Sequence, residues 1–325
     1  MRDPFHELIG ASRLIMALRQ RVVRAAQFDV PVLIEGETGT GKELVARALH
    51  YESPRRDGPF VPVNCGALPE ALIENEFLGH RRGAFTHAVG DSPGLLRLAQ
   101  GGTLFLDEID SLPAKGQVML LRLLEEPVYR PLGAEREQRF DVRMLAASNQ
   151  SLDELAVLGR FRADLLFRLR LIELRIPPLR DREGDVELLA EHFMHSVAQR
   201  YHLRAGHLQA SARAWLYQHD WPGNVRELQH WVCRTLLLGE SNDLHPLPED
   251  MVHMAHGSEA RPLQYRDARA RALEAFDRGY LHELLSRHHG NITHAAREAG
   301  KERRALARLL KRYALDAASF RSMAR

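Results

Sequence analysis

Gly36-Glu37-Thr38-Gly39-Thr40-Gly41-Lys42-Glu43 is the most informative stretch of this 325-residue chain. It follows the apolar run Pro31-Val-Leu-Ile-Glu35 and precedes the amphipathic run Glu43–His50, so it joins a predicted strand to a predicted helix. Its glycines let the backbone turn tightly enough to point several N–H groups at one place, where a helix N-terminus adds partial positive charge. Lys42 would reach the β- and γ-phosphates of a nucleotide. The stretch therefore predicts a phosphate-binding loop.

One position of this loop departs from the general pattern. The pattern has Ser or Thr after the lysine to hold Mg²⁺, whereas this chain has Glu43. The alternative interpretation is a glycine-rich turn that binds nothing. The order of strand, loop and helix favours the phosphate site.

A second acidic element completes the predicted site. The run Gly101-Gly-Thr-Leu-Phe-Leu-Asp107-Glu108 is an apolar strand that ends in two acids. Asp107 would lie at the carboxyl edge of the sheet, where it can hold Mg²⁺ or its water. Glu108 could orient and deprotonate a water molecule, which favours hydrolysis over simple binding. An Asp-Glu pair at a strand end is often only a solvated turn, so its weight comes from the glycine loop. Together they predict a nucleoside-triphosphatase.

The order of predicted elements indicates an α/β fold followed by helices. Up to about residue 180, short apolar runs alternate with amphipathic stretches, which predicts a parallel sheet with flanking helices. Helical patterns then follow, and residues 239–264 have the Gly, Ser and Pro content of a linker. The predicted strands are Val32–Ile34, Phe60–Val63, Thr103–Leu106 and Val142–Ala147, and the predicted helices are Glu43–His50, Lys115–Leu124, Val186–Arg200, Ala210–His219, Asn224–Leu238 and Leu273–Leu285.

The chain resembles the AAA+ bacterial enhancer-binding proteins that activate sigma-54 RNA polymerase. The resemblance extends from about Leu8 to the C-terminus and includes the family's own form of the phosphate loop, with Glu43. Further matching motifs occur in order: Asn64-Cys65, Glu76 to His80, Gly83-Ala-Phe-Thr86, the Asp107-Glu108 strand, Phe161-Arg162-Ala-Asp-Leu165 with Arg168-Leu169, Pro177-Pro-Leu-Arg-Asp-Arg182, and Trp221-Pro-Gly-Asn-Val-Arg-Glu-Leu228.

This resemblance implies four parts. An AAA+ α/β P-loop ATPase subdomain would occupy residues 8–178 and a helical lid subdomain residues 179–238. A linker would follow at 239–266, and a Fis-type helix-turn-helix DNA-binding domain at 267–325. The phosphate loop, residues Gly36 to Glu43, would bind ATP with Mg²⁺, and Asp107 would be the metal ligand.

The resemblance also implies roles for single residues of the ATPase. Asn64 would hydrogen-bond Glu108 and switch it between idle and active positions, and Asn149 would sense the γ-phosphate. Arg162 and Arg168 would act as arginine fingers in a neighbouring subunit's site. Such fingers require a ring, which for this family is a hexamer. Arg226 of the lid would contact the nucleotide of its own subunit.

The predicted sigma-54 loop departs from the family at one position of its tip. The family's Gly-Ala-Phe-Thr-Gly-Ala reads Gly83-Ala-Phe85-Thr86-His87-Ala88 here, so Phe85 and Thr86 are kept. A side chain at His87 restricts backbone shapes with φ > 0 that glycine adopts freely. Arg97 also stands where the family usually has Glu, which is expected to relay nucleotide state to the loop. These departures leave open a DNA-binding AAA+ regulator that has lost sigma-54 remodelling.

The C-terminal segment predicts contact with a polyanion. Residues 259–325 carry 15 Lys and Arg against 8 Asp and Glu, whereas residues 1–258 carry 30 against 35. Asn291 or Thr293 can cap a short helix, and small alanines with Gly300 permit a helix-turn-helix whose second helix enters the major groove of enhancer DNA. The alternative is a solvated basic hairpin. The residues expected near the DNA are Thr293, Arg303, Arg304, Arg308 and Lys311.

Several expectations concern the whole protein. Motifs begin near residue 8, which is expected to leave no room for a sensor domain, as in the phage-shock activator. Control is then expected from a regulatory protein that binds in trans, from a co-activator or from the expression level. No apolar run approaches the ~20 residues needed to span a bilayer. The two cysteines, Cys65 and Cys233, indicate a reducing compartment, and we expect a cytoplasmic location. A metal-dependent hydrolase is disfavoured because His288 and His289 lack ligand spacing.

Overall fold

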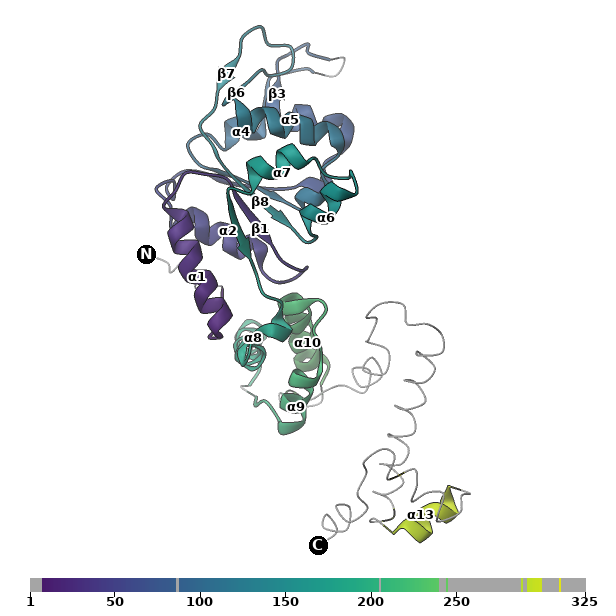
Figure 1. Cartoon of the computed structure of the whole chain (residues 1–325). Coiled ribbons are helices and arrows are strands. Elements are labelled where there is room, and N and C mark those ends of the chain that lie inside the picture. The colour runs from purple at the N-terminus through teal and green to yellow at the C-terminus, as the bar shows by residue number, and fades with distance from the viewer. Residues whose placement is uncertain are drawn as a thin grey trace. The chain divides into compact units, whose positions relative to one another are not determined.

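A computed structural model describes residues 8–85, 88–204, 206–239, 244, 288, 291–299 and 310 (Figure 1). The chain divides into two compact units, residues 1–251 and 252–325. Each unit is described by itself.

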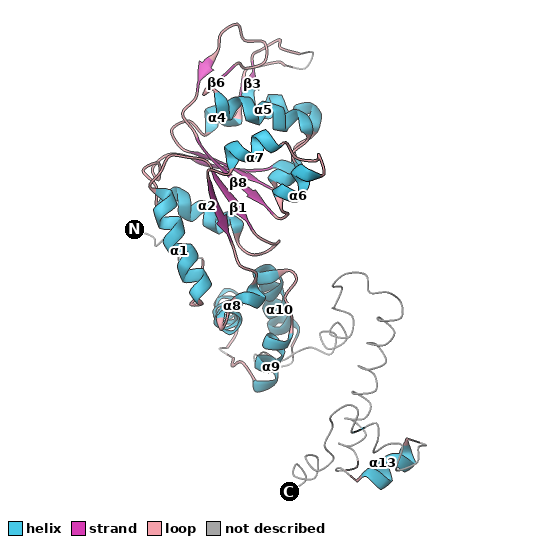
Figure 2. Ribbon diagram, viewed as in Figure 1, coloured by secondary structure: helices cyan, strands magenta, loops and turns pink. Residues whose placement is uncertain are grey.

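A five-stranded parallel sheet forms the centre of the first unit (Figure 2). The strand order is β2-β5-β8-β1-β9, and every neighbouring pair is parallel. All five strands therefore end at one edge of the sheet, which is where ligands bind in such folds. The strands are β1 (Val32–Glu35), β2 (Phe60–Asn64), β5 (Thr103–Asp107), β8 (Arg143–Ser148) and β9 (Ile172–Arg175).

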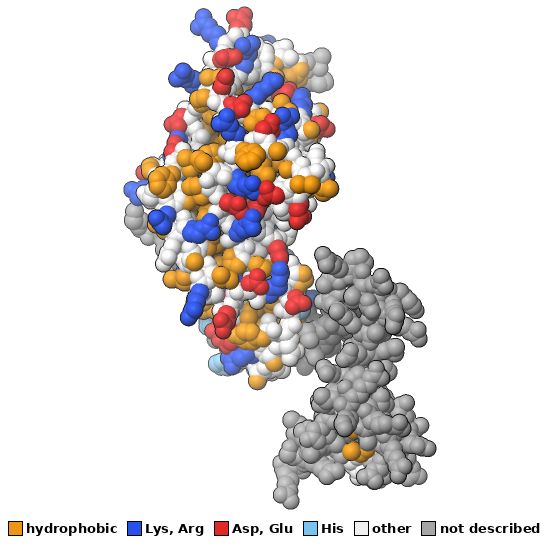
Figure 3. All heavy atoms as spheres, viewed as in Figure 1, with side chains coloured by type: hydrophobic (Ala, Val, Ile, Leu, Met, Phe, Trp, Pro, Cys, Tyr) orange, Lys and Arg blue, Asp and Glu red, His pale blue; other side chains and the backbone are white. Residues whose placement is uncertain are grey.

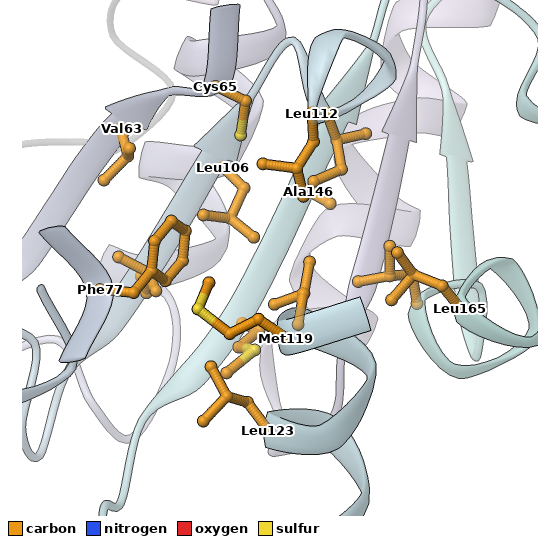
Figure 4. Close-up of a cluster of buried hydrophobic side chains, with 14 of the residues drawn as sticks. Val63, Cys65, Phe77, Leu106, Leu112, Met119, Leu123, Ala146 and Leu165 are labelled. Atoms are coloured by element: carbon orange, nitrogen blue, oxygen red, sulfur yellow. The ribbon is translucent and has the colours of Figure 1, made fainter. Parts of the chain in front are cut away.

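Helices cover both faces of this sheet (Figure 1). Because successive strand residues point to opposite faces, Leu104 and Leu106 enter one hydrophobic cluster while Phe105 enters the other. Figure 4 shows the first cluster, where Met119 and Leu123 of α5 pack toward the sheet. Helices α1 (Arg13–Ala26) and α2 (Lys42–Tyr51) lie on one face; α5 (Ala114–Glu125), α6 (Leu152–Val157) and α7 (Ala163–Leu169) lie on the other.

Two short hairpins project beyond α5 (Figure 1). The backbone of Leu132, between β6 and β7, bonds to Gly79 O and to Arg81 N, both at 2.9 Å, so the two hairpins are joined. The elements of this region are α3 (Ile73–Leu78), β3 (Gly79–His80), β4 (Ser92–Pro93), α4 (Leu95–Leu98), β6 (Val128–Tyr129) and β7 (Gln138–Arg139).

The lid is a three-helix layer after the sheet. Helices α8 (Asp185–Tyr201), α9 (Ala210–Gln218) and α10 (Asn224–Leu238) match the predicted ranges to within one residue at each end. They enclose a separate hydrophobic cluster in which the Trp215 and Trp231 rings stack with centroids 4.5 Å apart. The 3₁₀ turns of this unit are η1 (Cys65–Ala67), η2 (Glu70–Leu72), η3 (Ile109–Ser111) and η4 (Leu179–Asp181).

The second unit is described only around α13 (Ile292–Glu298). The Asn291 carboxamide oxygen accepts a hydrogen bond from His294 N at 3.3 Å, so Asn291 caps this helix. Ala295, Ala296 and Leu310 are buried, as helix packing through small residues requires. The predicted helix Leu273–Leu285 lies outside the described residues.

Charged side chains of both signs are mixed across the visible face of the first unit (Figure 3). In the described part of the chain, no helix combines the length and the apolar character that crossing a bilayer needs.

Candidate active site

A pocket of about 340 Å³ lies where the carboxyl edge of the sheet meets the lid. The phosphate loop and the start of α2 form its floor, and the residues at the ends of β5 and β8 form one wall. Lid side chains and the segment before α1 form an apolar side suited to a planar base. Its lining residues are Leu8, Ile9, Thr38, Gly39, Thr40, Gly41, Lys42, Glu43, Leu44, Asp107, Glu108, Asn149, Arg182, Leu189, Phe193, Val225, Arg226 and Gln229.

The phosphate loop has the backbone that a polyphosphate needs. Gly39 and Gly41 have φ of 78° and 98°, in the region that glycine adopts at no steric cost. Gly41 also caps the ten-residue helix α2, whose N-terminal N–H groups point toward the pocket floor. Lys42 Nζ donates to Gly36 O at 2.8 Å and to Glu37 O at 3.2 Å, and burial lowers the pKa of this amine. These features fit a bound nucleotide phosphate.

Asp107 ends β5, and Glu108 directly follows it. Burial raises the pKa of Asp107, although the nearby Lys42 ammonium opposes that shift. Glu108 has φ of 53° and ψ of 46°, a left-handed conformation uncommon for a residue with a Cβ, and its N–H donates to Asp107 Oδ1 at 3.0 Å. Strained backbone of this kind concentrates at functional sites. Asp107 has the carboxylate that Mg²⁺ prefers, and Glu108 is turned toward the same pocket.

Asn64 lies at the end of β2, beside β5. Its carboxamide oxygen accepts hydrogen bonds from Gly66 N at 2.8 Å and Ala67 N at 3.2 Å, and so caps η1. Among the described residues, the hydrogen bond expected between Asn64 and Glu108 is not formed: the amide oxygen of Asn64 accepts from two backbone N–H groups, and its amide nitrogen does not donate to Glu108. The switching role of Asn64 stays a prediction.

Ser148 and Gln150, on either side of Asn149 at the pocket wall, are tied to Asp110, and the sequence prediction missed all three. Ser148 Oγ donates to Asp110 Oδ1 at 3.0 Å, and Gln150 Nε2 donates to Asp110 Oδ2 at 3.0 Å. Asp110 thereby ties the turn after β5 to the residues on both sides of Asn149. In the sequence, the one feature that could have pointed to Asp110 is its position shortly after the Asp107-Glu108 pair.

The lid adds two arginines to the pocket. Arg226 lines it, and its backbone N–H donates to Gly39 O at 3.3 Å; its contact with the nucleotide stays a prediction. Arg182, which the sequence prediction assigned no role, is buried and donates to Thr40 O at 3.1 Å and Pro177 O at 2.9 Å. Burial lowers the pKa of Arg182 to about 10. The apolar lid residues of the pocket were also missed, because they share a helical pattern with core residues.

Arg162 and Arg168 do not line the pocket of their own chain. Arg162 precedes α7 and pairs with Asp164 at 2.7 Å, and Arg168 on α7 lies 3.6 Å from Glu125. The side chains of both arginines are about half exposed, at 45% and 59%. Their exposure on the α7 surface leaves them available to another molecule.

The predicted sigma-54 loop extends from β3. Its base is closed by an ion pair between Arg81 and Asp91 and by the bond from Gly83 N to Ala88 O at 2.9 Å. The Phe85 side chain is 42% exposed, with its ring edge-on to His80 at 4.9 Å between centroids. Thr86 and His87 lie outside the described residues.

Of the remaining predicted site residues, Arg97 is described in full, whereas the side chains of the predicted DNA contacts are not. Arg97 is exposed on α4 and lines a second cavity of about 370 Å³ at the base of the loop. Thr293 belongs to α13, and its side chain is outside the described part of the chain. Also outside it are Arg303, Arg304, Arg308 and Lys311.

Comparison with known protein families identifies the family to which this chain belongs. The family model "Sigma-54 interaction domain" matches residues 8–175, more than half of the chain. The chain belongs to the sigma-54 interaction-domain family. Further models match residues 180–262, as an AAA+ ATPase lid domain, and residues 272–313, as a bacterial regulatory protein of the Fis family. The chain is thus an AAA+ ATPase with a nucleotide-binding pocket, a helical lid and a Fis-type helix-turn-helix.

Individual relatives of this sigma-54 interaction-domain protein agree with that assignment. It is 42% identical over 316 residues to the transcriptional regulatory protein GlrR of Escherichia coli K12, covering 97% of the chain and 69% of GlrR. It is 44% identical to the C4-dicarboxylate transport regulator DctD of Pseudomonas aeruginosa, covering 95% of the chain and 64% of DctD. A crystal structure of NtrX from Brucella abortus in complex with ATP superposes with a TM-score of 0.70 at 34% identity, covering 97% of this chain and 71% of NtrX.

Proposed function

We propose that this protein is an ATP-hydrolysing transcriptional activator that binds enhancer DNA and remodels the sigma-54 RNA polymerase closed complex. The observation that carries the proposal is that the sigma-54 interaction domain combines a pocket lined by the phosphate loop, Asp107 and Glu108 with a projecting loop that exposes Phe85. An exposed aromatic side chain of that kind is typical of a contact with another protein.

In the proposed hydrolysis, each pocket residue acts on ATP through a defined group. The phosphate-loop N–H groups and Lys42 would neutralise the phosphate charge, and Asp107 would hold Mg²⁺, which would supply further positive charge to the phosphates. Glu108 accepts a proton from the attacking water, and Asn149 orients the γ-phosphate. Arg226 contacts the nucleotide from the lid of the same subunit.

The proposed assembly is a hexameric ring. Arg162 and Arg168 are absent from the lining of their own pocket and exposed on the α7 surface. Their proposed role is to stabilise the charge that develops in a neighbouring subunit's site, which requires subunits in head-to-tail contact. Isolated subunits would then hydrolyse ATP poorly.

The proposed activation of transcription depends on the sigma-54 loop and on the DNA-binding domain. Phe85 and Thr86, with His87 beside them, contact sigma-54, while the basic C-terminal helix holds the ring at the enhancer. Arg303, Arg304, Arg308, Lys311 and Thr293 are the proposed DNA contacts. Since sigma-54 polymerase and its promoters are the targets, we place the activity in the cytoplasm.

Transcription in a purified system tests this function. The protein is added with ATP to a template that carries a sigma-54 promoter and to sigma-54 holoenzyme; holoenzyme with the housekeeping sigma factor on its own promoter is the control. The proposal predicts ATP-dependent transcript from the first reaction and no stimulation of the second. ATP hydrolysis without sigma-54-dependent transcript would contradict it.

A further inference from the structure

Glu37 belongs to the phosphate loop, but its side chain faces the lid. Its backbone carbonyl accepts from Lys42 Nζ, whereas its carboxylate is absent from the pocket lining. The two carboxylate oxygens accept from the two terminal nitrogens of Arg180 at 2.5 and 2.8 Å. Bidentate pairing of this kind fixes geometry as well as charge. Arg180 lies in η4, where the chain passes from the sheet to the lid.

Asn224, the first residue of α10, completes this contact. Its carboxamide nitrogen donates to Glu37 Oε2 and to Thr38 O, each at 3.1 Å, and its oxygen accepts from Leu179 N at 2.8 Å. The side chain is fully buried, and φ is +51°, a left-handed conformation that Asn tolerates better than most residues. One side chain therefore joins the phosphate loop, the connection to the lid and the start of α10.

The backbones meet at the same place. A Cβ on Gly39 would lie 2.1 Å from Gly223 O, so the phosphate loop and the start of α10 are in direct contact. Arg226, two residues beyond Asn224, donates its backbone N–H to Gly39 O. Any movement of α10 away from the loop must therefore break the contacts of Asn224 and Glu37, and it also withdraws Arg226 and Val225 from the pocket.

We infer that Glu37, Arg180 and Asn224 form a latch that holds the lid closed over the nucleotide and controls how fast the nucleotide leaves. The three side chains are positioning residues, because they act on the nucleotide only through the lid. The inference rests on the proposed binding of ATP in this pocket.

The side chains of Glu37 and Arg180 are 41% and 42% exposed, and an exposed ion pair by itself contributes little to stability. What distinguishes this contact is the buried Asn224 amide, which donates to the same Glu37 carboxylate. Hydrogen bonding from Arg180 lowers the pKa of Glu37, and hydrogen bonding from Glu37 raises the pKa of Arg180, so both partners are charged together at neutral pH.

A double-mutant cycle on the full chain tests the latch. Glu37→Gln, Arg180→Gln and the double variant are compared with wild type for dissociation of a fluorescent ribose-labelled ADP, and for KM and kcat of ATP hydrolysis. Each single variant should release the ADP about tenfold faster and raise KM by a similar factor, a coupling of ordinary size. The value of kcat should stay within about twofold, since Lys42, Asp107 and Glu108 are unchanged. The double variant should release ADP no faster than either single variant, because each substitution already breaks the same contact.

A matched control removes an ion pair that is internal to the lid. Glu187 on α8 pairs with Arg213 on α9 at 2.6 Å, and Glu187→Gln should leave ADP release unchanged. Thermal melting without nucleotide identifies any variant that fails to fold.

Substitutions of Asn224 separate the amide from the backbone. Asn224→Gly keeps the left-handed backbone and removes the amide, and it should speed ADP release as Glu37→Gln does. Asn224→Asp keeps the shape but turns an oxygen toward the Glu37 carboxylate, so it should release ADP faster still. Wild-type release by Asn224→Gly would overturn the role of the amide.

The outcomes distinguish the latch from the proposed function. If wild type binds no labelled ADP, the nucleotide pocket itself is refuted. If wild type binds ADP and the latch variants release it at the wild-type rate, or if their effects add fully, the latch is refuted. A fall in kcat with unchanged KM would also refute it, since that result places Glu37 in the chemical step.

Discussion

Asn64 and Glu108 face each other across Gly66. A Cβ on Gly66 would lie 3.2 Å from Asn64 Oδ1 and 2.9 Å from Glu108 Oε2. The two side chains thus occupy the same small region at the carboxyl edge of β2 and β5, although Asn64 is bonded to Gly66 N and Ala67 N. A short movement of either side chain would bring them into contact.

Glu108→Gln should retain ATP binding and abolish hydrolysis. The amide keeps the shape of the carboxylate but cannot accept a proton from water at neutral pH. Nucleotide binding and phosphate release are measured on the same preparation. Wild-type turnover by this variant would refute the assignment of Glu108 as the base.

Arg162→Ala and Lys42→Ala should each lose hydrolysis alone and recover part of it when mixed. In a mixed ring, an intact phosphate loop on one subunit meets an intact Arg162 on its neighbour. Phosphate release is measured for each variant alone and for mixtures at several ratios. If no mixture exceeds the separate variants, Arg162 does not act between subunits.

Phe85→Ala should hydrolyse ATP within about twofold of wild type and lose promoter opening. The Phe85 ring projects from the loop and is not part of the pocket. Val89→Ala is the matched control, because Val89 is an exposed apolar residue, 85% accessible, just beyond the loop. Equal loss of promoter opening in Phe85→Ala and Val89→Ala would contradict a specific contact by Phe85.

His50 should make the first unit less stable as the pH falls. This side chain is buried, with its Nδ1 2.9 Å from Thr103 Oγ1, and burial lowers its pKa. The unfolded chain takes up the proton near pH 6.5, above the folded pKa of His50, so the free energy of unfolding falls as the pH drops through that value.

His50→Gln provides the comparison for that pH dependence. Urea midpoints are measured from pH 8 to pH 5.5 for both proteins. The variant should be less stable at pH 8 by about 1 kcal/mol, for the altered hydrogen bond, and should lose less stability on acidification. Parallel pH curves would show that His50 does not titrate with unfolding.

Replacing Arg303 and Arg304 by Ala should weaken DNA binding while ATPase activity persists. Each lost phosphate contact reduces the dependence of log affinity on log salt by about 1. Gel retardation on enhancer DNA at several salt concentrations measures this. Unchanged retardation would refute the placement of these arginines.

The sequence predicts the elements that carry strong local patterns. The predicted strands at β1, β2, β5 and β8, the phosphate loop and the lid helix Asn224–Leu238 all agree with the structure. Helix α1 was missed although Ile15, Leu18 and Val22 have helical spacing and are buried. Strand β9 was also missed: Ile172-Glu173-Leu174-Arg175 alternates apolar and charged residues as a strand does, but the run is only four residues long.

Contacts between distant residues could not be predicted in this way. Glu37 is 143 residues from Arg180 and 187 from Asn224, and no local period connects them. The sequence therefore assigned Glu37 to nucleotide binding, whereas the structure turns its carboxylate to the lid. The exposure of Arg162 and the capping by Asn64 likewise depend on how the chain packs.

Promoter opening shows whether this protein remodels the sigma-54 closed complex. Permanganate reactivity of a sigma-54 promoter is measured with holoenzyme and the wild-type protein, with ATP or a non-hydrolysable analogue, beside His87→Gly. We expect melted DNA with wild type and ATP, and none with the analogue. ATP hydrolysis by wild type with melting only by His87→Gly would contradict it, because the loop would then have lost its action on sigma-54.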